Sequence, residues 1–292
     1  MNKLRRTMLF MPGNNPGMLL NAGILGADSV ILDLEDAVSL TEKDSARVLV
    51  REAIKSIDYS NVEVAVRINP FDTEFGLPDV DVIARVKPDS IMLPKADEDQ
   101  VRALHEALSK IEQEEGFEEG SIKIIPIIET AFGLENVYNI IKASRRIVAV
   151  LLGAEDLTAD LGIKRTKEGE EIFYARNKVA TACKALKVDS IDTPFTDTND
   201  YEGLARDTAK AKSIGMTGKA AINPRQIDTI HSVLAPTEAE IKHAQRILAA
   251  MEEAKREGKG VFSLDGKMVD APIINRAITT MKLAKMLGLV RK

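Results

Sequence analysis

The chain has 292 residues, which is enough for one large barrel or two modest domains. A net charge of −5, no tryptophan and 4% aromatic residues argue against a nucleic-acid-binding role. One cysteine, Cys183, excludes an internal disulfide and a cysteine zinc cluster, and its helical surroundings predict a small buried thiol. No apolar run has the length of a membrane span or of a signal peptide, so we expect no membrane association and a cytoplasmic location.

Short apolar runs typical of buried parallel strands recur along the first 222 residues. They are Thr7–Met11, Ser29–Leu34, Val62–Ile68, Ser90–Leu93, Ile122–Ile128, Val148–Leu152, Val188–Ile191 and Thr217–Ile222. Helical patterns separate most of them, at Lys43–Ile57, Asp97–Glu115, Leu134–Ala143, Glu171–Lys187 and Tyr201–Ile214. Eight strands alternating with helices predict an α/β fold, a TIM (β/α)8 barrel over residues 1–235. The alternative is a doubly wound open sheet, although no G-x-G-x-x-G follows the first strand.

The pattern changes after Pro236. A long helix is predicted over Thr237–Glu257, beginning with the capping box Thr-Glu-Ala-Glu. The segment VFSLDGKMVDAP predicts a short hairpin with Asp265-Gly266 as its turn, and a last helix should run from about Ile273 to Leu287. Residues 236–292 exceed the needs of eight βα units, so we expect a C-terminal helical extension of the same domain that serves as a lid or an oligomer arm.

Two acids follow neighbouring predicted strands directly. Glu129 comes after the fifth strand, and Asp156 lies beside Glu155 in an expected turn that begins at Gly153. The carboxyl ends of barrel strands meet at the face where such barrels carry their chemistry. Oxygen ligands suit a hard cation, so Glu129 and Asp156 predict a Mg²⁺ site. The alternative is that each acid only caps a helix or forms a turn.

Further polar residues at strand ends are expected to complete a charged pocket on this face. They are Glu35, Asp36, Arg67, Lys95, Asp192 and Asn223. Arg67 can pair with a substrate carboxylate, and beside a divalent cation it would hold a 2-oxo or 2-hydroxy acid for carbon–carbon cleavage next to a carbonyl. Lys95 has a rival interpretation as a Schiff-base lysine. The three histidines lie in helical stretches and are not expected to be ligands.

A set of motifs occurs in a fixed order along nearly the whole chain. It consists of RRTMLFMPGNNPGML, SVILDLEDAV, VAVRINP, IMLPKAD, IIPIIETAFGL, LLGAEDLTADLG, KAAINPRQ and DGKMVDAP. Together these motifs resemble the citrate lyase β-subunit family, of the metal-dependent HpcH/HpaI-type aldolase superfamily that also contains malyl-CoA lyases. The resemblance implies a TIM-type barrel and a lyase that cleaves a citryl thioester, carried by an acyl carrier protein or coenzyme A, to oxaloacetate and an acetyl thioester.

The resemblance also implies roles for individual residues. It implies Arg67 as the ligand of the substrate carboxylate, and Glu129 and Asp156 as Mg²⁺ ligands, with Glu129 also facing the substrate. Asp270, which the residue pattern alone interprets equally well as a helix N-cap, matches an acid/base that related thioester lyases supply from a neighbouring subunit.

The partners implied by the resemblance are an α subunit that transfers the acyl group, a γ acyl carrier subunit with a CoA-derived arm, and further copies in a homo-oligomer. Arg5 and Arg6 match the basic start of the family and are candidates for contacts with phosphates of that arm. Two alternatives stay open. One is a lyase for malyl-CoA or a related β-hydroxyacyl-CoA on the same fold, and the other is a non-catalytic scaffold subunit.

Overall fold

The computed structural model describes residues 3–256 and 261–290. The chain divides into two compact units, one up to His231 and one from Ser232 onward, and each is described here by itself. No helix in the described parts of the chain combines the length and the apolarity needed to cross a membrane.

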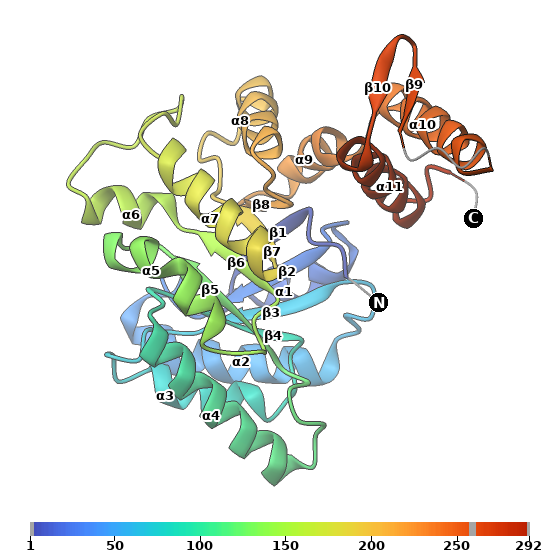
Figure 1. The fold of residues 1–292 in the computed structure, drawn as a ribbon. Coiled ribbons are helices and arrows are strands. Elements are labelled where there is room, and N and C mark those ends of the chain that lie inside the picture. The colour runs from blue at the N-terminus through green and yellow to red at the C-terminus, as the bar shows by residue number, and fades with distance from the viewer. Residues whose placement is uncertain (1–2, 257–260, 291–292) are drawn as a thin grey trace. The chain divides into compact units, whose positions relative to one another are not determined.

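The first unit is built on a closed barrel of parallel strands (Figure 1). The strands are β1 (Thr7–Pro12), β2 (Ser29–Asp33), β3 (Glu63–Arg67), β4 (Ser90–Leu93), β5 (Lys123–Ile128), β6 (Ala149–Leu152), β7 (Asp189–Asp192) and β8 (Gly218–Ala221). The last strand pairs with the first, with Met8 opposite Ala220, so the sheet has no free edge. The prediction of a TIM-type barrel is confirmed, and the open-sheet alternative is excluded.

Helices surround the barrel, and the five predicted between strands are present with their bounds moved by at most a few residues. The helices of this part are α1 (Pro16–Asn21), α2 (Lys43–Ser56), α3 (Gly76–Ala84), α4 (Glu98–Glu115), α5 (Ala131–Lys142), α6 (Ala154–Asp160), α7 (Phe173–Leu186), α8 (Tyr201–Ser213) and α9 (Ile227–Leu234). Short 3₁₀ turns form η1 (Ala22–Ile24), η2 (Leu40–Glu42) and η3 (Pro224–Gln226). The expectation of a simple turn after Gly153 was wrong, because Glu155 and Asp156 lie in the first turn of α6.

Alternate residues of each strand fill the barrel interior. The buried inner side chains are Met8, Ile31, Ala65, Met92, Ile125, Ile127, Ala149, Leu151, Ile191 and Ala220. Successive side chains of a strand point to opposite faces, so a residue two positions after an inner one also points inward. Asp33, Arg67 and Glu129 follow Ile31, Ala65 and Ile127 in this way and line the carboxyl end of the barrel, which we call the mouth.

The second unit is a pair of helices with a hairpin. The helices α10 (Glu238–Arg256) and α11 (Ala271–Met286) pack together, and β9 (Phe262–Leu264) pairs antiparallel with β10 (Lys267–Val269). Its small core contains Ala244, Ile247, Val269 and Ala277. The predicted turn is confirmed, because Asp265 and Gly266 both have positive φ (52° and 74°), as a type I′ hairpin requires. Glu257, the expected last residue of the first of these helices, lies outside the described residues.

Candidate active site

Arg67 lies at the centre of a buried group of acids at the mouth. Because Asp33 is the register partner of Arg67 in the β2–β3 pair, the Asp33 carboxylate accepts from Nε at 2.7 Å and from Nη2 at 2.6 Å. The third nitrogen, Nη1, lies 2.8 Å from Glu35 Oε2 and 3.6 Å from Asp36 Oδ2. The ring of Phe10 lies 4.9 Å from the guanidinium carbon. The two bonds to Asp33 fix the guanidinium plane and turn its Nη1 edge toward Glu35.

Glu129 lies directly after β5 and is almost fully buried. Its Oε1 accepts a hydrogen bond of 2.6 Å from the backbone N–H of Lys95, a residue in the left-handed region with a φ of 45°. A Cβ atom at Gly153 would lie 2.5 Å from Glu129 Oε2 and 2.7 Å from Glu129 Cβ. Glycine at position 153 therefore leaves the space that this carboxylate occupies.

Asp156 is half-buried in the first turn of α6, and no hydrogen bond or ion pair among the described residues engages its carboxylate. Burial raises the pKa of Glu129 to about 7, the N–H of Lys95 opposes this, and the negative charge of Asp156 raises it further. The two carboxylates predicted to bind a metal are thus close enough to influence one another, and neither is neutralised by a basic side chain in contact.

Glu35 extends the same electrostatic group. Burial raises its pKa to about 8; Arg67 opposes this, and the charges of Asp36, Glu129 and Asp33 reinforce it. Its buried Oε2 forms an ion pair with Arg67 Nη1 at 2.8 Å but accepts no hydrogen bond of normal geometry from the described residues.

We use the name mouth cluster for Asp33, Glu35, Asp36, Arg67, Glu129 and Asp156. A further basic group, Lys43, lies against the segment that follows β2, where its Nζ donates to the backbone carbonyls of Leu34 and Glu35 at 2.8 and 2.6 Å. Acids outnumber bases in the cluster, so its chemistry favours an added cation.

The donor set fits magnesium. The described residues contain no group of three or more His, Cys, Asp or Glu side chains arranged to hold a metal. Mg²⁺, however, commonly binds through one or two carboxylates and completes its octahedron with water and substrate oxygens. Glu129 and Asp156 offer two such carboxylates, and the missing side chain at Gly153 leaves the space that Glu129 needs.

Comparisons with known proteins identify the family. The model of the HpcH/HpaI aldolase/citrate lyase family matches residues 6–224. The chain belongs to this family. Its members with curated names include a citrate lyase subunit beta from Leuconostoc mesenteroides subsp. cremoris, 47% identical over 99% of this chain and 96% of that one. An L-malyl-CoA/beta-methylmalyl-CoA lyase from Rhodobacter capsulatus is 34% identical over 97% of this chain and 96% of that one.

A solved structure with the same fold is the protein CitE of Mycobacterium tuberculosis in complex with magnesium, acetoacetate and coenzyme A. The two chains are 30% identical in sequence, and their structures match with a TM-score of 0.80 over 97% of this chain and 98% of that chain. Family membership and these relatives confirm the prediction of a carbon–carbon lyase.

Two predicted pocket residues do not face the mouth. Asp192 follows the inner residue Ile191 and therefore points outward, where it is fully buried between Arg176 and Lys219. Its Oδ1 accepts from Arg176 Nε at 2.8 Å, and its Oδ2 accepts from Lys219 Nζ at 2.6 Å. Asp207 of α8 contacts the same two bases at 2.7 Å each. We call Arg176, Asp192, Asp207 and Lys219 the outer cluster.

Asn223 also has a structural role, because its side chain accepts from the N–H of Arg225 and caps η3. Lys95 contributes its backbone N–H, while its side chain is exposed and lacks the apolar surroundings that activate a Schiff-base lysine. Cys183 is buried as predicted, and burial raises the pKa of its thiol to about 12.

Arg5 and Arg6, which match the basic N-terminal start of the family, lie at the opposite end of the barrel. Arg5 precedes β1 and is bound to Glu63 at 2.7 Å and Asp189 at 2.9 Å. Arg6 is bound to Asp28 at 2.7 Å. Both guanidinium groups are thus occupied at the amino ends of the strands, away from the mouth, which corrects the expectation that they meet phosphates.

Asp270 lies in the second unit as the N-cap of α11, where its carboxylate accepts weakly from the N–H of Ile273 at 3.4 Å. The capping role predicted from its position is present. Its role as an acid/base stays a prediction.

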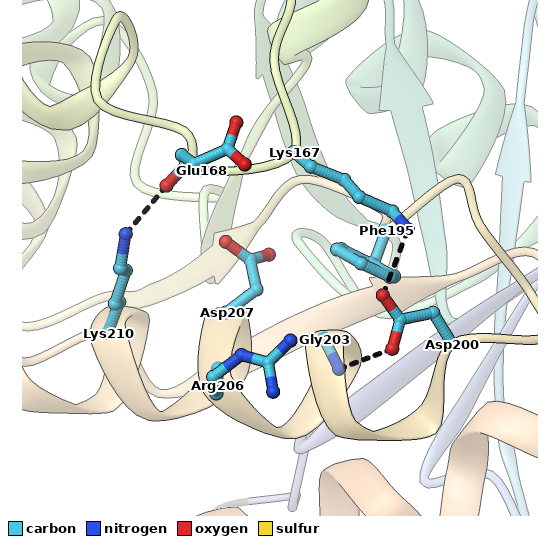
Figure 2. A pocket seen from close by; sticks show the side chains of 8 residues that line it. All are labelled: Lys167, Glu168, Phe195, Asp200, Gly203, Arg206, Asp207 and Lys210. Atoms are coloured by element: carbon cyan, nitrogen blue, oxygen red, sulfur yellow. Dashed lines mark hydrogen bonds and ion pairs between the residues drawn. The ribbon is translucent and has the colours of Figure 1, made fainter.

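A cavity of about 190 Å³ lies against α8 and contains none of the predicted site residues (Figure 2). Its charged side chains are largely paired, with Lys167 bound to Asp200 at 2.9 Å and Lys210 to Glu170 at 3.0 Å. Asp207 in its wall belongs to the outer cluster. None of the residues predicted for the site therefore lines this cavity.

Some contributors to the site were missed by sequence reasoning. The pairing of Asp33 with Arg67, the space left by Gly153 and the backbone N–H of Lys95 were not predicted. The sequence carried no signal for the pairing of Asp33 with Arg67, because both strands are apolar at successive positions and do not reveal which residues point inward. The left-handed backbone of Lys95 has no sequence signal.

Proposed function

We propose that this chain is a Mg²⁺-dependent lyase that cleaves a citryl thioester to oxaloacetate and an acetyl thioester. It acts as the β subunit of a cytoplasmic citrate lyase, with an acyl-transferring α subunit and a γ acyl carrier, and as a homo-oligomer. The observation that carries this proposal is the pair of unneutralised carboxylates, Glu129 and Asp156, beside the buried guanidinium of Arg67. The similarity to a citrate lyase subunit beta and to a magnesium-bound CitE supports it.

Glu129 and Asp156 would hold the cation. When bound, Mg²⁺ would polarise the oxygen next to the substrate carboxylate and stabilise negative charge there. The N–H of Lys95 keeps one oxygen of Glu129 in place, so the carboxylate is oriented before any ligand arrives.

Arg67 would bind the carboxylate of the oxaloacetate half through its Nη1 edge. Asp33 occupies Nε and Nη2 and so orients the guanidinium. The Nη1 edge lies 2.8 Å from Glu35 Oε2, so the substrate carboxylate would displace Glu35 from it. Glu35, with a pKa of about 8, is largely protonated at pH 7 and leaves the positive charge of Arg67 available to the substrate.

The reaction breaks the bond between the hydroxyl-bearing carbon and the methylene carbon next to the thioester. The hydroxyl loses its proton to become the ketone of oxaloacetate, and the methylene carbon gains a proton. The carboxyl group of Asp270, contributed by a neighbouring copy, would supply that proton.

Replacement of a carboxylate tests the proposal. Glu129→Gln and Asp156→Asn should each lower citryl-CoA cleavage by roughly 1000-fold, because several kcal/mol of charge stabilisation are lost. Thermal unfolding should change little, and Glu118→Gln, which alters an exposed acid, should keep full activity. Full activity of the wild type after treatment with a chelator would refute the metal role.

The malyl-CoA lyase alternative is favoured by the 34% identity to the Rhodobacter capsulatus enzyme. A direct comparison of kcat/KM for citryl-CoA and malyl-CoA distinguishes the two substrates, and we expect citryl-CoA to be preferred. Turnover of either thioester by the isolated chain would exclude the scaffold alternative.

A further inference from the structure

The helix α6 carries Asp156 but is only seven residues long. Helices of this length are not stable by themselves in water, so tertiary contacts decide where such a helix lies. Helix α6 buries Ala154, Leu157 and Thr158, and Glu155 lies 3.6 Å from Arg165. Hydrogen bonds to Thr193 and from Ala131 also hold it, one at each end, and neither involves a residue of the proposed metal site.

At its start, α6 is held by Thr193. The Thr193 hydroxyl accepts a hydrogen bond of 3.2 Å from the N–H of Ala154, the first residue of the helix, and both residues are fully buried. The carbonyl of Thr193 in turn accepts from Lys219 Nζ at 2.8 Å. This chain of contacts ties the beginning of α6 to the outer cluster and so to β7 and β8.

At its end, α6 is held by Asp160. The carboxylate of Asp160 accepts a hydrogen bond of 2.7 Å from the N–H of Ala131, the first residue of α5. Ala131 lies two residues after Glu129, so this bond joins the segment that carries Asp156 directly to the segment that carries Glu129. Asp156 and Asp160 are four residues apart on one helix face, a spacing at which like charges are unfavourable, which argues for a specific role of Asp160.

We infer that Thr193 and Asp160 are positioning residues that fix the Asp156 carboxylate relative to Glu129 for a divalent cation. This inference rests on the metal-binding role proposed above. Both act through the backbone of α6 or of its neighbour, one step further from the cation than a direct partner of a ligand side chain, whose loss typically weakens metal binding by about 10- to 100-fold. We therefore expect an effect at the lower end of that range.

The test is the affinity of the full-length chain for Mn²⁺, measured without substrate by electron paramagnetic resonance or calorimetry. Asp160→Ala and Thr193→Val remove the two acceptors, and we expect each to raise the Kd by about 10-fold or more. Asp160→Asn and Thr193→Ser keep an acceptor oxygen and should restore the Kd to within about 3-fold of the wild type. Glu155→Gln removes a charge from the same helix without breaking either contact and serves as the matched control.

Wild-type Mn²⁺ affinity in both Asp160→Ala and Thr193→Val would overturn the inference, even if their thermal unfolding temperatures fall. Loss of affinity that the conservative variants fail to restore would also overturn it. Asp160 is exposed, so Asp160→Ala keeps the test available if the buried Thr193→Val does not fold. If the wild type binds no Mn²⁺, or Glu129→Gln binds it unchanged, the proposed metal role fails and this inference fails with it.

Discussion

The barrel carries two buried groups of charged side chains that look alike in composition and differ in balance. In the outer cluster, two bases face two acids and each base contacts both acids. The mouth cluster has five acids and one arginine, which contacts Asp33, Glu35 and Asp36. The charges of the outer cluster balance without a ligand, whereas the mouth cluster has more acidic than basic side chains. Charge balance, and not burial, therefore separates a structural group from a candidate catalytic one.

The pKa values of the buried carboxyl groups differ between the two clusters in the same way. Burial opposes the ionised form of Asp207, but the charges of Lys219 and Arg176 outweigh it and hold the pKa below its usual value. At the mouth, burial and neighbouring acids raise the pKa of Glu35 to about 8 and of Glu129 to about 7. The outer cluster thus stabilises the ionised form of Asp207, whereas the mouth cluster destabilises the ionised forms of Glu35 and Glu129. The following changes should separate the two clusters.

The largest effect on folding is expected in the outer cluster. Lys219→Met leaves Asp192 and Asp207 with one base instead of two, and removal of one partner from a buried ionic group costs about 3–5 kcal/mol of unfolding free energy. Denaturant unfolding measures this loss. Lys184→Met, on the exposed side of α7, should change stability by less than about 0.5 kcal/mol. A loss below about 1 kcal/mol at Lys219 would contradict the structural role given to this cluster.

The mouth cluster should make the metal-free protein less stable as pH rises. Glu129 and Glu35 have folded pKa values above their unfolded values near 4.5, so the folded state binds more protons between about pH 5 and pH 8. The two pKa values rise by about 2.5 and 3.5 units. At about 1.4 kcal/mol for each pKa unit, stability should therefore fall by several kcal/mol across this window.

Thermal unfolding of chelator-treated protein from pH 5 to pH 8 measures this slope. Glu129→Gln should reduce it, while Glu74→Gln, which changes an exposed acid, should not. Added Mg²⁺ should also reduce it, because the cation favours the ionised carboxylate. Stability that is flat or rises over this range would show that the acids of the mouth are not desolvated as described.

A smaller effect is expected from Gly153→Ala. The backbone φ of −91° accepts alanine, but the new Cβ would lie 2.5 Å from Glu129 Oε2 and displace that carboxylate. Crowding of this kind costs about 1–3 kcal/mol, and we expect most of it to appear as weaker Mg²⁺ binding in calorimetry. Gly17→Ala, whose Cβ would meet its nearest atom at 3.5 Å, is the matched glycine control. Unchanged Mg²⁺ affinity would argue that Glu129 is not a ligand.

The sequence by itself determined the order of strands and helices, the barrel, and the hairpin turn at Asp265-Gly266. These depend on local patterns: apolar runs, helical periodicity and turn residues, all of which act over short distances along the chain. It also placed Arg67, Glu129 and Asp156 after strands, and the structure brings these three into one electrostatic group.

Only the tertiary structure decided which strand-end residues face the mouth. Parallel strands of a barrel are apolar on both faces, so the sequence does not reveal which alternate residues point inward. Asp192 and Asp33 look equivalent in the sequence, yet one lies outside the barrel with Arg176 and the other inside with Arg67. Helix α6 was not predicted for a related reason. Seven residues are too few to show a clear helical periodicity, and the helix depends on the tertiary contacts of Thr193 and Asp160.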